Sequence, residues 1–167
     1  MMALDEIIKT LGLKPHPEGG YYKETYRSHG QINKECLGLK YNGERHYSTC
    51  IYFLITSDNF SAFHRINQDE IWHFYEGASI KLHTISETGE HSEFIIGRDF
   101  AKGEMPQLVV PGGHWFAAEV RIQNSYALVG CTVSPGFSFE DFELADREQL
   151  ISKFPEHEKL ITKFTKH

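Results

Sequence analysis

The sequence has little cysteine, no excess of positive charge and no long hydrophobic run. Its three cysteines are far apart and form no C-x-x-C pair, which favours reduced, mostly buried thiols. The 23 acidic residues outnumber the 17 basic ones and no basic stripe occurs, so we expect no nucleic-acid partner. The first residues lack a basic lead and a long apolar stretch, so we expect no signal peptide, no membrane partner and a cytoplasmic location.

Helical periodicity is confined to the two ends of the chain. Apolar residues at spacings of three and four predict a helix over about residues 3–11, and Gly12 supplies its C-terminal stop. Near the other end, Asp146 is placed to cap a helix together with Gln149, and Pro155 divides the segment into two short helices over about residues 146–164. We expect these helices to pack outside the remaining structure.

The chain between about residues 20 and 143 has a β pattern. Short apolar or alternating segments recur every eight to twelve residues with turn signals between them, which is typical of a sandwich or a barrel. The polar segment 30–45 is interpreted as a surface loop or an edge hairpin. With a length of 167 residues, the chain is expected to form a single domain over residues 1–167.

The stretch Phe60–Gly77, FSAFHRINQDEIWHFYEG, contains the most informative polar residues. His64 and Glu70 lie six residues apart between segments that are typical of strands. Such a pair can form a metal site, a general-base pair or a polar patch in a ligand cavity. A second polar pair, His16 and Glu18, lies in a Pro- and Gly-rich loop, which is interpreted as a turn that caps the barrel rather than as a ligand site.

Five ordered segments resemble the DUF985 family, also called cupin 5, of the cupin superfamily. They are PHPEGGYYKETYRS, TCIYFLI, FHRINQDEIWHFYEG, VPGGHWFAAE and GCTVSPGFSFEDFELA. The resemblance covers about residues 11–145 and implies a double-stranded β-helix, that is a cupin jelly-roll barrel, with a ligand-sized cavity. It also implies a homodimer. It implies little about the reaction.

The general cupin metal pattern is incomplete in this sequence. Ile66 stands where the pattern has its second histidine, and Phe116 stands where the second half, Pro-x-Gly-x-x-His, has its histidine. A transition-metal site needs about three protein ligands, so the two that remain would bind a divalent cation weakly. His114 has the strand parity of Phe116 and would add a ligand if it faced inward. We therefore expect no metal cofactor.

Without a metal, His64 and Glu70 suit general-base catalysis, with the carboxylate orienting the imidazole. This looks like the arrangement in metal-free cupin epimerases and isomerases of nucleotide sugars. The required acid is left open among Tyr22, Tyr52 and Tyr126. Alternatively, the two side chains satisfy each other's hydrogen bonds and hold a cavity open.

Trp72 and Phe74 share strand parity with Glu70 and are predicted to form an aromatic wall beside it, or else to pack in the core. The sequence therefore predicts a cupin that binds a small molecule. The candidate ligand-binding residues are Tyr22, Tyr52, Trp72, Phe74 and His114. The leading hypothesis is a metal-independent isomerase or epimerase acting on a sugar-like substrate; the alternatives are a metal-dependent dioxygenase or isomerase and a non-catalytic binding or sensor protein.

Overall fold

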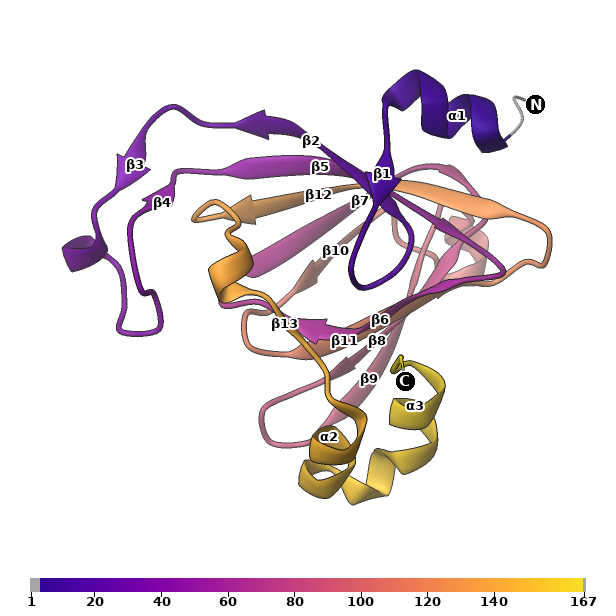
Figure 1. Cartoon of the computed structure of the whole chain (residues 1–167). Coiled ribbons are helices and arrows are strands. Elements are labelled where there is room, and N and C mark those ends of the chain that lie inside the picture. Colours follow the sequence, from indigo (N-terminus) through magenta and orange to yellow (C-terminus); the bar gives the residue numbers. More distant parts are fainter. Residues whose placement is uncertain (1–3, 167) are drawn as a thin grey trace.

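Two antiparallel sheets face each other in the computed structural model, which describes residues 4–166 (Figure 1). The six-stranded sheet has the order β1 (Lys14–Pro15), β2 (Tyr21–Arg27), β5 (Thr49–Thr56), β12 (Tyr126–Ser134), β7 (Asp69–Gly77) and β10 (Gln107–Val110). The five-stranded sheet has the order β13 (Glu143–Leu144), β6 (Phe60–Arg65), β11 (Trp115–Val120), β8 (Ile80–Ile85) and β9 (His91–Ile96). This arrangement confirms the predicted mainly β, cupin-type architecture.

The main hydrophobic core lies between the two sheets. Phe53 and Trp72 project from the six-stranded sheet, and Leu82 and Phe116 project from the five-stranded sheet; none of them is more than 1% exposed. The Trp72 ring contacts Phe53 and Phe116 edge-on, with centroid separations of 5.7 and 6.4 Å. Burial of each such side chain stabilises the fold by about 1.5–3 kcal/mol. The interlocked rings fix the spacing of the two sheets.

The predicted helices cover the outer faces of the sheets. Helix α1 (Leu4–Leu11) packs Ile7 against Leu54 of the six-stranded sheet. Helices α2 (Arg147–Lys153) and α3 (Glu158–Lys163) flank a 3-10 turn, η4 (Pro155–His157), and pack Phe154 and Phe164 against the five-stranded sheet. The carboxylate of Asp146 accepts a 2.9 Å hydrogen bond from the Gln149 amide, so the predicted helix cap is confirmed.

A hairpin arm extends beyond the ends of β2 and β5 (Figure 1). It consists of β3 (Gln31–Ile32), the 3-10 turn η1 (Lys34–Cys36) and β4 (Arg45–His46), which agrees with the edge hairpin expected for residues 30–45. Arg45 anchors the arm through two 2.7 Å hydrogen bonds to Asp141 in the 3-10 turn η3 (Phe139–Asp141). The arm and η3 are thereby held against each other at one end of the barrel.

The cysteines differ in part from the sequence-based expectation. All three are free, but only Cys131 is buried; Cys50 is half-buried and Cys36 is exposed. Cys36 lies in the arm, where few side chains are available to cover it. The remaining short helix, η2 (Phe100–Lys102), connects β9 to β10. Within residues 4–166, no helix is long and apolar enough to cross a membrane.

Candidate functional site

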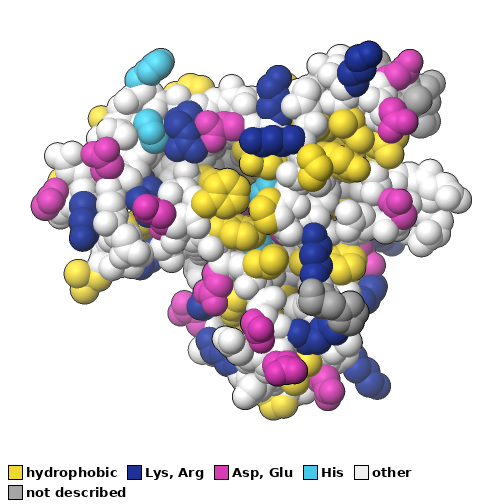
Figure 2. Space-filling view, in the orientation of Figure 1, with side chains coloured by type: hydrophobic (Ala, Val, Ile, Leu, Met, Phe, Trp, Pro, Cys, Tyr) yellow, Lys and Arg dark blue, Asp and Glu magenta, His cyan; other side chains and the backbone are white. Residues whose placement is uncertain are grey.

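A cavity of about 700 Å³ opens at the end of the barrel that carries the arm. Strands of both sheets, the loop before β2, the arm and η3 contribute its lining, including Tyr22, Phe53, His64, Ile66, Glu70, Cys131 and Phe142. Figure 2 shows hydrophobic side chains gathered around a hollow in this face, with histidine inside it. The volume is in the range that holds a small organic molecule.

The loop from His16 to Gly20 places two polar side chains at the cavity. The amides of His16 and Gly19 donate 3.0 Å hydrogen bonds to the carbonyls of Gly20 and His16, and the carbonyl of Glu18 accepts from the Ala62 amide at 2.8 Å. Gly19 and Gly20 have φ angles of +117° and +72°, which side chains of L-residues rarely allow. The two glycines therefore permit the turn that aims His16 and Glu18 at β6.

The Glu18 side chain is buried among hydrogen-bond donors. Its Oε1 accepts a 2.7 Å hydrogen bond from the Ser61 hydroxyl, and its Oε2 lies 3.0 Å from Nε2 of His64. Burial alone would raise the pKa of Glu18, but the charge and hydrogen bond of His64 outweigh it and the pKa is lowered. Glu18 is therefore a carboxylate at neutral pH.

His64 carries the matching positive charge. Its Nδ1 lies 2.7 Å from the carbonyl oxygen of Ala62, which only accepts, while Nε2 faces the Glu18 carboxylate. Burial would lower the pKa of His64, but the charge and hydrogen bond of Glu18 raise it above its usual value. Both ring nitrogens therefore hold protons, and His64 is an imidazolium.

His16 differs from His64 in its protonation. Its Nδ1 accepts a hydrogen bond from the Glu18 amide at 3.3 Å, and burial lowers its pKa. A nitrogen that accepts from an amide carries no proton, so the 3.3 Å contact between this Nδ1 and Glu18 Oε2 is not an ion pair. The neutral ring packs edge-on against Tyr22, with a centroid separation of 4.6 Å.

Glu70 is a buried carboxyl group of the cavity whose pKa lies near neutrality. Burial raises the pKa of Glu70 to about 7; the charge of His64 opposes the shift and the charge of Glu18 adds to it. The Cys131 thiol borders the carboxyl group, and burial followed by the charge of Glu70 raises its pKa well above the usual value. The cavity thus combines a fixed ion pair with a carboxyl group that exchanges its proton near pH 7.

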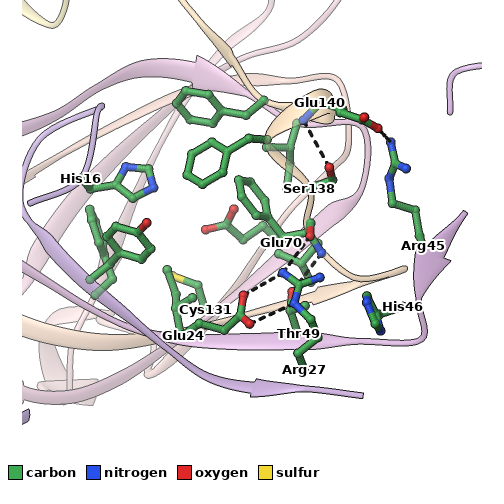
Figure 3. Close-up of a pocket in the computed structure, with 18 of the residues that line it drawn as sticks. His16, Glu24, Arg27, Arg45, His46, Thr49, Glu70, Cys131, Ser138 and Glu140 are labelled. Atoms are coloured by element: carbon green, nitrogen blue, oxygen red, sulfur yellow. Dashed lines mark hydrogen bonds and ion pairs between the residues drawn. The ribbon is translucent and has the colours of Figure 1, made fainter. Parts of the chain in front are cut away.

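Aromatic side chains and two arginines surround the outer part of the cavity. Phe137, Phe139 and Phe142 pack on one another, and the Phe139 ring lies nearly parallel to His16 at 6.1 Å. Figure 3 shows His16 and Arg45 on opposite sides of the space. Arg27, which also lines the cavity, is held by Glu24 at 2.7–2.9 Å. The lining therefore offers flat apolar contacts and charged groups together.

Comparison with known proteins agrees with this geometry. A family model described as cupin superfamily (DUF985) matches residues 5–145. The chain belongs to the DUF985 family of cupins. It is 35% identical over 149 residues to an uncharacterized protein of Saccharomyces cerevisiae, with 83% of this chain and 73% of the yeast protein covered.

Solved structures extend the comparison. This cupin resembles a protein of Shewanella oneidensis, with a TM-score of 0.90, 38% identity and 99% of each chain covered. It resembles a hypothetical protein from Leishmania major equally well, with a TM-score of 0.90, 35% identity, and 99% of this chain and 100% of that chain covered. Oxalate decarboxylase from Bacillus subtilis shares the fold at a TM-score of 0.54 and 13% identity, over 90% of this chain and 36% of the enzyme.

The structure brings three of the predicted site residues together in this cupin. His64, Glu70 and Tyr22 all line the cavity. The carboxylate that hydrogen-bonds to His64 is Glu18, however, and not Glu70 as the sequence suggested. The Pro- and Gly-rich loop therefore supplies a side chain to the site in addition to forming a turn.

The other predicted ligand-binding residues lie elsewhere. Trp72 is 1% exposed in the core, and Phe74 packs on the same core below Arg98, so neither lines the cavity. Tyr52 lies on the outer face of its sheet beside Tyr75. His114 precedes β11 in a turn and does not line the cavity either.

The cavity residues do not assemble the usual cupin metal ligands. Phe116 lies opposite His64 in the β6–β11 register, with ring centroids 4.0 Å apart, and Ile66 contributes an alkyl side chain to the lining. Among residues 4–166, no three cavity side chains of ligand type have donor atoms that all lie within 4.8 Å of one another. His16, Glu18, His64 and Glu70, together with Cys131 beside Glu70, are side chains of ligand type in the cavity lining.

Proposed function

We propose that this cupin binds a small, polar, carbonyl-containing molecule of the sugar type and shifts a proton on it, as an isomerase or epimerase does. The observation that carries this proposal is Glu70, a buried carboxyl group that lines the cavity with a pKa of about 7. Such a group is present in both protonation states near neutral pH, which is the property of an efficient general acid or base.

The proton transfer uses Glu70 and the charge of His64. The Glu70 carboxylate takes a proton from the carbon next to the carbonyl, and the electron pair moves to the carbonyl oxygen to form an enolate. The imidazolium of His64 stabilises that negative charge through its field, because both its N–H groups are already held by Glu18 and Ala62. Delivery of a proton to the opposite face of the same carbon inverts that carbon. Delivery of the proton to the former carbonyl carbon instead isomerises the molecule, with the proton of the neighbouring hydroxyl passing to the former carbonyl oxygen as a new carbonyl forms.

The proposal assigns the role of the second acid to Tyr22. Of the three phenols considered from the sequence, Tyr22 lines the cavity, whereas Tyr52 lies outside it and the Tyr126 hydroxyl donates to Glu76. Tyr22 lies on β2, three strands along the six-stranded sheet from Glu70 on β7, and the proposal assigns to it the face of the ligand that Glu70 does not reach. Epimerisation by two groups needs such an arrangement.

The cavity lining favours a ligand with a flat or ring-shaped part and a polar or anionic part. Phe139 and Phe142 offer faces on which a sugar or a base can stack. Arg27 and Lys14 supply positive charge at the lining for a phosphate or carboxylate. These features support a sugar-like or nucleotide-sugar-like ligand.

A non-catalytic binding protein is the second candidate. The fully engaged N–H groups of His64 favour it, because no donor on that ring is free to bond to a reacting oxygen. In this case the Glu18–His64 pair fixes the shape of the cavity. A ligand would then bind saturably and remain unchanged.

Native mass spectrometry of freshly purified protein, followed by proton exchange in D₂O, tests the proposal. Keto sugars, sugar phosphates and nucleotide sugars are incubated with the protein, and NMR records deuterium entering the carbon next to the carbonyl. We expect exchange that Glu70→Gln abolishes and Tyr22→Phe slows, while His29→Asn, an exposed histidine on the β2–β3 connection, leaves it unchanged. Unchanged exchange in Glu70→Gln would refute the assignment.

Two further results decide between the alternatives. Tight binding of a ligand without any exchange would identify a binding protein. Loss of the exchange after chelator treatment, with recovery on adding iron, manganese, nickel or zinc, would identify a metal-dependent enzyme.

A further inference from the structure

Three side chains of metal-ligand type gather on the hairpin formed by β8 and β9, outside the cavity described above. His83 lies on β8 directly opposite Glu93 on β9, and His91 lies two residues before Glu93. Alternation along a strand therefore places all three on one face. This face is turned away from the barrel interior, since the His83 ring packs against Phe164 beyond α3, at 5.1 Å.

The donor atoms lie close to the spacing that one ion requires. Nδ1 of His83 lies 3.1 Å from Nε2 of His91 and 3.6 Å from Oε2 of Glu93, and the three donor atoms all lie within 4.8 Å of one another. Ligands of a tetrahedral zinc ion at about 2.0–2.1 Å are separated from each other by about 3.3 Å. The two measured separations lie on either side of that value, so small side-chain rotations would complete the site.

The surroundings suit a cation with two nitrogen ligands and one oxygen ligand. The His83 side chain is 5% exposed, and its Nδ1 faces both His91 and Glu93. Glu93 uses Oε1 for Lys81 at 3.2 Å and leaves Oε2 toward His83. Lys81 brings a positive charge near the site, and Glu93 compensates for it. The Glu93 side chain is 46% exposed, so water has access to a fourth position.

We propose that His83, His91 and Glu93 bind one divalent late transition-metal ion, of the class of Zn²⁺ and Co²⁺, on the outside of the barrel. Two imidazoles and one carboxylate form a ligand set that zinc uses in proteins, with water as the fourth ligand. The site is separate from the proposed proton-transfer site, because none of its three residues lines the cavity.

The bound ion would tie the hairpin to the C-terminal helices. The His91 ring lies against the His157 ring with centroids 5.6 Å apart, and Nε2 of His157 donates to the Gly89 carbonyl at 2.7 Å. His157 belongs to η4, between the two C-terminal helices. An ion on His91 would fix the imidazole that His157 packs on, so metal binding would raise the melting temperature of the chain.

Titration of chelator-treated, dialysed full-length protein with Co²⁺ tests this site. Visible d–d absorption reports tetrahedral coordination, and competition with Zn²⁺ gives the zinc affinity. We expect one ion per chain, and we expect His91→Asn and Glu93→Gln to weaken binding at least about tenfold. Neither side chain is fully buried, so both variants should fold. Matched controls are His29→Asn and Glu90→Gln. Both alter exposed side chains that are not among the three ligands, although Glu90 directly precedes His91, and both variants should bind as the parent does.

Several outcomes would overturn the proposal. Absence of Co²⁺ and Zn²⁺ binding at submillimolar concentration would show that His83 and His91 only share a hydrogen bond. Equal loss of binding in the controls would show non-specific association. Binding that survives His91→Asn but is lost in His64→Asn would place the ion in the cavity. The last outcome would leave the proton-transfer proposal untouched. Loss of proton transfer in Glu70→Gln would likewise say nothing about the metal site. The two proposals can therefore fail separately.

Discussion

Nε2 of His64 lies 3.0 Å from Oε2 of Glu18, and this ion pair joins the loop before β2 to strand β6 of the five-stranded sheet. The relationship changes the chemistry expected from the sequence, because an imidazolium with both protons engaged is not a base. In the proposed mechanism the proton-accepting role therefore belongs to Glu70, whose pKa of about 7 is set mainly by burial. The two carboxylates of the site therefore have different roles.

The first prediction concerns the stability of this pair. Glu18→Gln leaves the His64 charge buried without its partner, and breaking a buried pair in this way destabilises a protein by about 3–5 kcal/mol. We expect a loss of this order in urea denaturation near neutral pH. As a control, Glu143→Gln breaks the Arg65–Glu143 pair, whose side chains are 31% and 54% exposed, and should change the stability by less than about 1 kcal/mol. Similar losses of stability in both variants would contradict the interpretation that Glu18 and His64 form a buried ion pair.

The second prediction concerns the pH dependence that Glu70 imposes. Its folded pKa of about 7 is above the ordinary 4.5, so the folded chain binds more protons than the unfolded chain between these values. The contribution of Glu70 to stability therefore falls as the pH rises from about 4.5 to 7 and is constant above that. The Glu70→Gln variant has no carboxyl group at this position and therefore does not lose this stability as the pH rises. Relative to the parent, we expect the variant to gain on the order of 2 kcal/mol between about pH 5 and pH 8.

Urea denaturation at several pH values measures this difference. Glu90→Gln, an exposed carboxylate on the β8–β9 turn, serves as the control and should follow the parent at every pH. A pH-independent difference between Glu70→Gln and the parent would mean that Glu70 is not protonated near neutrality in the folded chain.

The sequence predicted the type of each secondary-structure element, and the side of a strand that a side chain faces, better than it predicted the position of that side chain along the barrel or the residue it contacts. Parity placed Trp72 on the same side of β7 as Glu70, and both are indeed buried. Parity does not tell how far along the barrel a residue lies, however, so it could not separate the core, which holds Trp72, from the cavity, which holds Glu70. The helix cap at Asp146 was predictable because it depends on local spacing alone.

The ion-pair partner of His64 could not be predicted from local sequence spacing. Glu18 reaches it through an irregular loop whose path depends on the close approach of Gly19 to β6. The only available signal was the Pro- and Gly-rich composition around Glu18, which indicates a fixed turn but not its direction. Long-range register, rather than local pattern, decides such contacts.

The third prediction is that the chain forms a homodimer. Strands β9 and β10 lie at the edges of the two sheets, and the segment containing them exposes the large apolar side chains Phe94, Phe100, Met105 and Val109. Exposed strand edges with apolar side chains favour pairing with a second copy. Sedimentation at micromolar concentration should give a dimer. We expect Val109→Lys to shift it toward monomer, whereas Ile122→Lys, at a similarly exposed turn position, should not. A monomeric parent would exclude this interface.

The fourth prediction tests the loop that carries His16 and Glu18. At Gly19, φ is +117° and an added Cβ would lie 2.1 Å from the Phe60 carbonyl oxygen, so Gly19→Ala must displace the loop from β6. This displacement separates Glu18 from His64, and we expect a stability loss of about 3 kcal/mol or more together with loss of ligand binding. Gly38→Ala in the arm is the matched control, because an added Cβ meets no atom within 4 Å there. If calorimetry finds equal melting temperatures for the two variants, the loop does not depend on Gly19 and the Glu18–His64 pair is not held by it.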